Sequence, residues 1–224
     1  MKILIAPDSF KGSLSSTEII EIVERAIYTH FQDAEIIKVP IADGGEGTVE
    51  AIVTACAGTY HTTEVLDPLL RPITATYGII NDGRTAVIEM AEASGIMLLK
   101  EEERNPLITT TYGAGQLIKK ALDEGIRDII MGIGGSATND GGIGAAMALG
   151  VQFLSAQGTE VGHGGRELAK IQSIDISCLD PRLKECTIDV ICDVTNPLTG
   201  ADGATFVYGP QKGAREWELC GLEA

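Results

Sequence analysis

The sequence is poor in aromatic and basic residues, and each shortage excludes a class of function. Aromatic side chains make up 4% of the 224 residues, and 17 Lys and Arg stand against 32 Asp and Glu, a formal net charge of −15. Nucleic-acid binding requires clustered Lys and Arg, so we expect no DNA or RNA partner. A hydrophobic content of 44% is enough to bury a core, which excludes a disordered chain.

The chain also lacks long apolar runs and paired cysteines. No run approaches the ~18 residues of a membrane-spanning helix, and the short apolar run at residues 3–6 is too brief for a secretion signal. The five cysteines have no C-x-x-C spacing, and the three histidines have no metal-ligand spacing. We therefore expect a cytoplasmic protein with reduced thiols and no membrane partner.

Glycine is abundant instead, at 27 residues, or about 12% of the chain against a typical ~7%. Many of these glycines lie in two segments between an expected strand and an expected helix. We call residues 43–48 the acidic glycine loop and residues 132–142 the long glycine loop.

Hydrophobic patterning predicts alternating strands and helices in two stretches. Strands are expected at 2–6 and 35–39, with a helix from the N-cap Ser15 to about residue 27 and another from 48 to about 56. The second stretch has a helix over 114–122, a strand over 127–131 and a helix over 142–149. This order is typical of right-handed βαβ units around a parallel sheet.

The region between these stretches has a different residue pattern, typical of antiparallel strands. Runs rich in β-branched residues at 62–66, 73–80 and 85–90 are separated by turn signals, including the hairpin sequence Asn81-Asp82-Gly83. Short strands are expected again at 151–154, 171–176 and 187–192. We therefore predict an α/β fold in which a parallel-sheet, flavodoxin-like or Rossmann-like domain is interrupted by a second, mixed α/β domain.

The expected domain boundaries follow from these differences in residue pattern. The first domain comprises 1–58 and 91–150, the second comprises 59–90 and 151–214, and residues 215–224 form an atypical tail.

The long glycine loop has the composition of an anion site. Gly134 and Gly135 let backbone N–H groups turn inward, and Ser136 and Thr138 add hydroxyl donors. The P-loop pattern is absent because no Lys follows these glycines. The dinucleotide fingerprint matches in part but lacks its acidic residue, which leaves an NAD-dependent dehydrogenase as a weaker alternative. A tight turn with close helix–strand packing is the purely structural interpretation.

Two acidic residues and two lysines complete the candidate site. Asp43 opens the acidic glycine loop, and Asp193 ends an apolar strand, where ligands bind in open α/β sheets, although either could simply cap a helix or turn. Acids facing a polyphosphate repel it unless a divalent metal lies between them, which favours Mg²⁺ with a nucleotide. Lys11 and Lys212 lie in Gly-containing loops and are candidate phosphate ligands.

The motifs at 6–14, 42–48, 132–142, 192–200 and 209–214, in this order, resemble those of bacterial class I glycerate kinases of the glycerate 2-kinase type. The resemblance implies Mg²⁺-assisted transfer of a phosphoryl group from ATP to D-glycerate, with 2-phosphoglycerate favoured. It implies that Gly134, Gly135, Ser136, Thr138 and Lys212 bind ATP. It also implies that Ser9 and Lys11 bind substrate, that Lys11 assists transfer, and that Asp193 and Asp43 hold Mg²⁺ or act as base.

The resemblance covers residues 1–214, whereas the family continues further. We therefore expect a C-terminally truncated kinase with an uncovered surface, reduced stability and a tendency to self-associate. A remnant that binds ligand without turnover is the alternative to an active enzyme.

Overall fold

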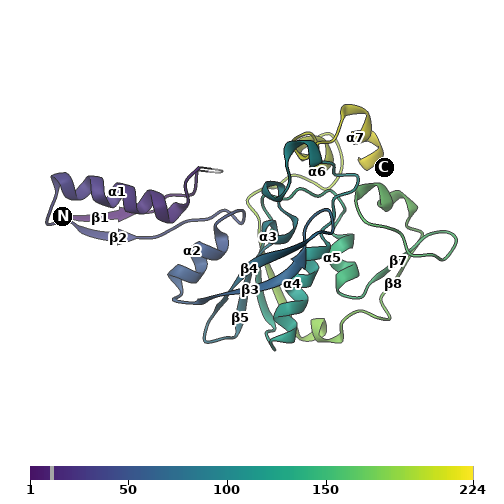
Figure 1. Ribbon diagram of the computed structural model, residues 1–224, viewed down its shortest axis with the longest axis horizontal. Helices are drawn as coiled ribbons and strands as arrows, with labels where there is room; N and C mark the ends of the chain where they lie inside the picture. The colour runs from purple at the N-terminus through teal and green to yellow at the C-terminus, as the bar shows by residue number, and fades with distance from the viewer. Residues whose placement is uncertain (11–12, 224) are drawn as a thin grey trace.

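The computed structural model describes residues 1–10 and 13–223 and has an α/β fold, as expected (Figure 1). Lys11 lies outside the described residues. The strands are β1 (Lys2–Ile5), β2 (Glu35–Lys38), β3 (Thr59–Leu66), β4 (Pro72–Ile80), β5 (Thr85–Glu89), β6 (Asp128–Gly132), β7 (Gln152–Leu154), β8 (Ser173–Asp175) and β9 (Thr187–Ile191). The α-helices are α1 (Ser16–His30), α2 (Thr48–Ala55), α3 (Ala91–Ser94), α4 (Tyr112–Asp123), α5 (Ile143–Ala148), α6 (Ala204–Tyr208) and α7 (Glu216–Glu223). Short 3₁₀ helices occupy Ile96–Leu98, Glu101–Glu103, Gly165–Lys170, Pro181–Glu185 and Pro210–Lys212.

The N-terminal βαβ unit has its own sheet and lies at one end of the molecule (Figure 1). β1 and β2 pair in parallel, and α1 connects them. The predicted N-cap is confirmed: the Oγ of Ser15 accepts from the N–H of Glu18 at 3.2 Å, and the Glu18 carboxylate accepts from the N–H of Ser15 at 2.8 Å. This reciprocal pair satisfies two backbone donors at the start of α1.

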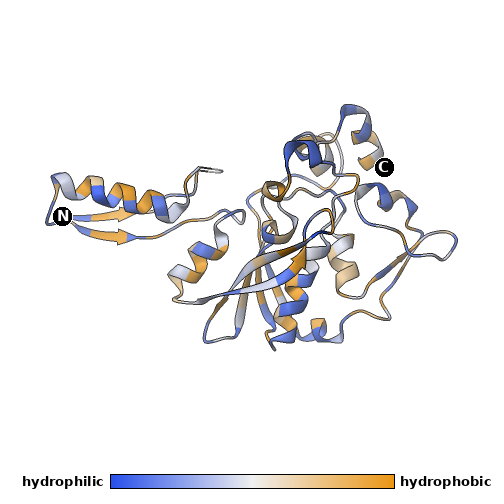
Figure 2. Cartoon of the chain, viewed as in Figure 1, coloured by the Kyte–Doolittle hydropathy of each residue, from blue (hydrophilic) through white to orange (hydrophobic). Residues whose placement is uncertain are grey.

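The middle residues of both strands of this sheet are hydrophobic, and part of one face is exposed (Figure 2). Ile5 is buried, whereas the alternating Leu4 is 62% exposed and its cross-strand partner Ile37 is 40% exposed. Because successive side chains in a strand point to opposite faces, α1 covers only one side of this sheet.

The larger sheet has five strands in the order β3-β4-β5-β6-β9. The first three are antiparallel, and the predicted hairpin between β4 and β5 is confirmed, with Asn81, Asp82 and Gly83 all at positive φ. β5, β6 and β9 then run parallel. The sheet is therefore mixed, and three parallel strands end at one edge.

The sheets cut across the expected domain division. β5 and β6 pair with each other although they were assigned to different domains, and β1 and β2 pair only with one another. The domain boundaries themselves stay a prediction.

Helices cover the larger sheet on both faces. The alternating Ala86 and Ile88 of β5 pack in a cluster with Leu117 and other residues of α4. Val87 points the opposite way, into a second cluster with Val49 and Val53 of α2. Because Glu89 follows Val87 by two residues, it is on the α2 side as well.

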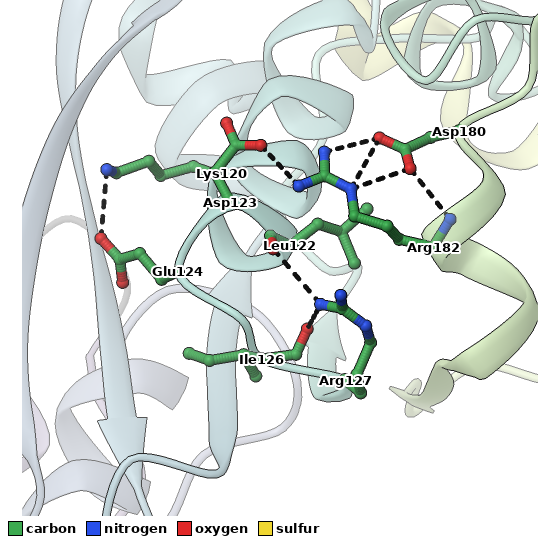
Figure 3. Close-up of polar contacts among 8 residues, drawn as sticks. All are labelled: Lys120, Leu122, Asp123, Glu124, Ile126, Arg127, Asp180 and Arg182. Atoms are coloured by element: carbon green, nitrogen blue, oxygen red, sulfur yellow. Dashed lines mark hydrogen bonds and ion pairs between the residues drawn. The ribbon is translucent and has the colours of Figure 1, made fainter.

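Arg182 fastens the chain before β9 to the end of α4, and Arg127 caps carbonyls at and just after the end of this helix (Figure 3). The Arg182 guanidinium contacts Asp180 at 2.7 Å and Asp123 at 2.8 Å, and it holds the pKa of Asp180 down at about 2. Arg127 donates from one nitrogen to the carbonyls of Leu122 and Ile126. These contacts lead the chain into β9 beside β6.

The C-terminal tail is helical in its described part. Leu219 and Leu222 of α7 are buried, whereas Trp217 is 70% exposed. Within the part of the chain that the structure describes, no helix has the length and apolar character needed to span a membrane.

Replacing Leu117 by Ala tests the main core. Leu117 is fully buried, so we expect Leu117→Ala to lower the free energy of unfolding by roughly 2–5 kcal/mol, measured by urea denaturation. Leu198→Ala is the matched control because Leu198 is 76% exposed, and it is expected to cost under about 0.5 kcal/mol. Equal losses in the two variants would contradict this description of the core.

Candidate active site

Three parallel strands of the larger sheet end side by side. Glu89 of β5 lies opposite Gly132 of β6, and Gly132 lies opposite Ile191 of β9. Neighbouring strands are about 4.8 Å apart, so the segments that follow them emerge from one edge. Ligands bind at this carboxyl edge in open α/β sheets.

The two glycine loops touch through their backbones at this edge. The N–H of Gly134 donates to the carbonyl of Gly44 at 2.9 Å. A Cβ on Gly132 would lie 2.4 Å from the Gly44 carbonyl oxygen, and one on Gly134 would lie 2.7 Å from the Cα of Gly45. Gly132 and Gly134 are therefore required for close packing, which is the structural interpretation offered by the sequence. Gly135 is different because it is exposed and has a φ of +72°.

The structure brings Asp43 and Asp193 to loops that converge on the same strand end. Asp43 accepts from the N–H of Gly45 at 3.0 Å, which shapes the acidic glycine loop. The next residue, Gly44, packs against Ile191, since a Cβ there would lie 2.5 Å from the Ile191 carbonyl oxygen. Asp193 follows Ile191 by two residues and is exposed. Among the described residues, no group of three His, Cys, Asp or Glu is arranged to hold a metal ion.

Lys212, which the family resemblance implies as a cofactor-binding residue, reaches the long glycine loop. Its Nζ donates to the Oγ of Ser136 at 2.7 Å and to the carbonyl of Thr138 at 2.6 Å. The side chain is buried, and this burial lowers the pKa of Lys212 to about 8. A buried ammonium beside a glycine loop can neutralise a bound anion.

Asp140 anchors the far end of the long glycine loop and was missed by sequence reasoning. Its carboxylate is 1% exposed and accepts from the N–H groups of Thr111, Gly142 and Gly144 and from the Thr111 hydroxyl. A buried carboxylate that accepts several hydrogen bonds fixes a loop strongly, because the loss of any donor would leave its charge uncompensated. The loop is thus held at one end by Gly44 and at the other by Asp140.

Glu89 was also missed, although it ends an apolar strand just as Asp193 does. It is 5% exposed, and its Oε1 accepts from the N–H of Val49 at 2.6 Å, near the start of α2. Burial raises the pKa of Glu89 to about 7, with Glu92 and Glu46 contributing in the same direction. Carboxyl groups with raised pKa values gather at functional sites.

Ser9 lies across from Glu89 on the N-terminal unit. Both residues line one cavity, of about 620 Å³, together with Glu46 and Gly47 of the acidic glycine loop. The N–H of Ser9 donates to the Asp8 carboxylate at 2.7 Å.

The fold and this edge define an α/β protein whose ligand site is formed by loops at the carboxyl ends of parallel strands. The comparisons with known proteins then identify the family. A sequence profile described as the glycerate kinase family matches residues 3–224. The chain belongs to the glycerate kinase family.

Two curated relatives and one solved structure support this assignment. The chain is 54% identical to glycerate 2-kinase of Escherichia coli K12, covering 100% of this chain and 58% of the relative. It is 55% identical to glycerate kinase of Bacillus subtilis 168, covering 96% and 56% respectively. A crystal structure of a protein assigned as glycerate kinase 2 in Salmonella typhimurium LT2 matches with a TM-score of 0.87 and 52% identity, covering 100% of this chain and 60% of that chain. The chain thus spans somewhat more than half the length of these relatives.

Adding a methyl group at Gly134 tests the contact between the loops. We expect Gly134→Ala to lower the free energy of unfolding by roughly 1–3 kcal/mol because the neighbouring Gly45 backbone must shift. Gly221→Ala is the control, since a Cβ there meets nothing within 4 Å, and it is expected to be neutral or slightly stabilising. Urea denaturation measures both, and a neutral Gly134→Ala would contradict the close contact.

Glu89 should make stability fall as pH rises. A raised pKa favours the protonated carboxyl in the folded state, so its contribution is present below pH ~4.5 and is lost as pH passes about 7. Relative to wild type, Glu89→Gln should therefore gain up to about 3 kcal/mol in free energy of unfolding between pH 4.5 and pH 8. Denaturation at these two pH values measures the gain, and a constant difference would refute the assignment.

Proposed function

We propose that this chain catalyses ATP-dependent phosphorylation of D-glycerate and that 2-phosphoglycerate is the product. A glycerate hydroxyl oxygen attacks the γ-phosphorus, the bond between that phosphorus and the bridging oxygen breaks, and ADP leaves. The observation that carries the proposal is Lys212, whose ammonium lies against Ser136 of the long glycine loop in a chain of this family. The printed name of the Escherichia coli relative, glycerate 2-kinase, supports the choice of product.

In this proposal the long glycine loop holds the phosphates of ATP. Gly135 and the Ser136 hydroxyl face the ligand together with Lys212, and Thr138 supports Lys212 through its carbonyl. Gly134 contributes by setting the position of the loop, because its own N–H already bonds to Gly44. The lysine is held against the loop by two hydrogen bonds, so a preorganised charge lies beside the proposed phosphate site.

Asp193 and Asp43 are proposed to hold Mg²⁺ or to act as base. Mg²⁺ takes one or two carboxylates and completes its coordination with water and phosphate oxygens, so two aspartates on adjoining loops fit this ion without a larger protein cage. When bound, the ion neutralises phosphate charge. Lys11 and Ser9, in the loop after β1, are proposed to bind the glycerate carboxylate, and Lys11 to assist transfer as well.

Three broader expectations belong to the same proposal. The chain is proposed to be cytoplasmic, and the division into domains at 1–58 with 91–150 and at 59–90 with 151–214 is retained. Self-association is proposed to use the exposed face of the N-terminal sheet, which includes Leu4 and Ile37.

A coupled assay of ADP release tests the function directly. We expect turnover when the chain receives Mg-ATP and D-glycerate, with the product position read by ³¹P and ¹³C NMR. Thermal stabilisation by both ligands without turnover would instead identify a remnant that binds but does not catalyse. Absence of both effects would contradict the proposed function for this chain.

Lys212→Met tests whether the buried ammonium of Lys212 itself contributes to catalysis. We expect a loss of at least about 30-fold in kcat/KM for ATP, or about 2 kcal/mol of transition-state stabilisation, because a charge beside the phosphates is removed. Lys184→Met is the control, since Lys184 is exposed and has no assigned role. An effect under about threefold in Lys212→Met would show that Lys212 does not act on the phosphates.

A further inference from the structure

The cavity of about 620 Å³ lies between the N-terminal unit and the larger sheet. One wall comes from the segment around Ser9 and the start of α1, and the other comes from the acidic glycine loop and α2. Glu89 lines it from the carboxyl end of β5 and is 5% exposed. The cavity therefore contains an almost completely buried carboxyl group.

Glu89 is fixed relative to the proposed phosphate site. Its backbone lies opposite Gly132, where the long glycine loop begins, and the N–H of the following Met90 donates to the Gly132 carbonyl at 2.8 Å. Adjacent strands are about 4.8 Å apart, so a substrate beside Glu89 lies next to the loop proposed to hold ATP. The hydrogen bond from Val49 fixes Oε1, which orients the carboxyl group.

The surroundings of Glu89 are acidic. Glu46 of the acidic glycine loop, Glu50 of α2, Glu92 of α3 and Glu18 of α1 line the same cavity, and no described Lys, Arg or His does. Burial raises the pKa of Glu89 to about 7, and Glu92 and Glu46 contribute in the same direction. A Gln would cap α2 through its amide oxygen without a buried charge, so capping alone gives no reason for a carboxyl group here. A general base works best with a pKa near the operating pH.

We propose that Glu89 is a catalytic residue that accepts the proton of the glycerate hydroxyl during phosphoryl transfer. The proton passes to a carboxylate oxygen of Glu89 as the hydroxyl oxygen bonds to the γ-phosphorus, and the bond to ADP breaks. This inference rests on the proposed function, and it leaves Asp193 and Asp43 with the metal ion. Glu89 later releases the proton to solvent through the cavity.

Matched variants in the coupled assay test this role. We expect Glu89→Gln to lower kcat at least 100-fold, to change KM for D-glycerate and ATP less than threefold, and to remove the acid limb of the pH profile of kcat. Glu89→Asp should retain a titrating acid limb at reduced kcat. Glu21→Gln, which changes an exposed carboxylate of α1 that does not line this cavity and has no assigned role, should behave as wild type. An acid limb that persists in Glu89→Gln, or a kcat within tenfold of wild type, would overturn the proposal.

A second measurement needs no turnover. The Glu89 carboxyl carbon can be titrated by ¹³C NMR, with its signal assigned by its loss in Glu89→Gln, in the free chain and with D-glycerate plus a non-hydrolysable Mg-ATP analogue. A bound substrate in contact with the carboxyl group should shift the pKa of Glu89 by at least half a unit from its value in the free chain. If the wild-type chain shows no turnover, the proposed function is contradicted. The titration still tests separately whether the bound substrate contacts the Glu89 carboxyl group. An unchanged titration would overturn the role of Glu89.

Discussion

The geometry of the candidate site depends on the direct backbone contact between two glycine loops that are far apart in the sequence. The hydrogen bond from Gly134 to Gly44 lets the acidic glycine loop lie against the loop that follows β6. A side chain at Gly132 or Gly134 would push these loops apart, and one at Gly44 would clash with Ile191 of β9. Asp43, which bonds to the N–H of Gly45, is held beside the long glycine loop by this contact.

Opposite charges are separated on the two sides of this contact. Lys212 approaches from the side of the long glycine loop, and the carboxylates of Glu89 and its neighbours line the cavity on the side of α2. In the proposed function, the ammonium of Lys212 stabilises the negative charge of the phosphoryl donor, and one carboxylate accepts the proton of the attacking hydroxyl. The strong acidity of the chain is compatible with a phosphate ligand because the buried Lys212 lies against the long glycine loop.

Local patterns in the sequence predicted most strands and four of the α-helices, but not α3, α6 or α7. The Ser15–Glu18 cap, the hairpin at Asn81 and the strands ending near Gly132 and Asp193 are set by residues within a few positions of each other. The sequence did not predict that β5 pairs with β6. Which strands pair depends on how helices bury both faces of the sheet, and this involves residues far apart in the chain. The sequence did not indicate Glu89 as a site residue, because its burial depends on packing against α2. Glycine is required at position 134 because the backbone of the acidic glycine loop, 90 residues earlier, packs against it. Such contacts leave no periodic signal.

The order of strands also has a consequence for folding. The N-terminal unit pairs β1 with β2 through one short helical crossover, so all its contacts are local in sequence. β9, by contrast, closes the edge of the larger sheet against β6 only after the chain has passed through β7, β8 and the Arg182 region. Contacts between distant segments form slowly because the loop between them must first be ordered. During synthesis, Asp193 therefore joins the sheet edge after Glu89 and both glycine loops are already made.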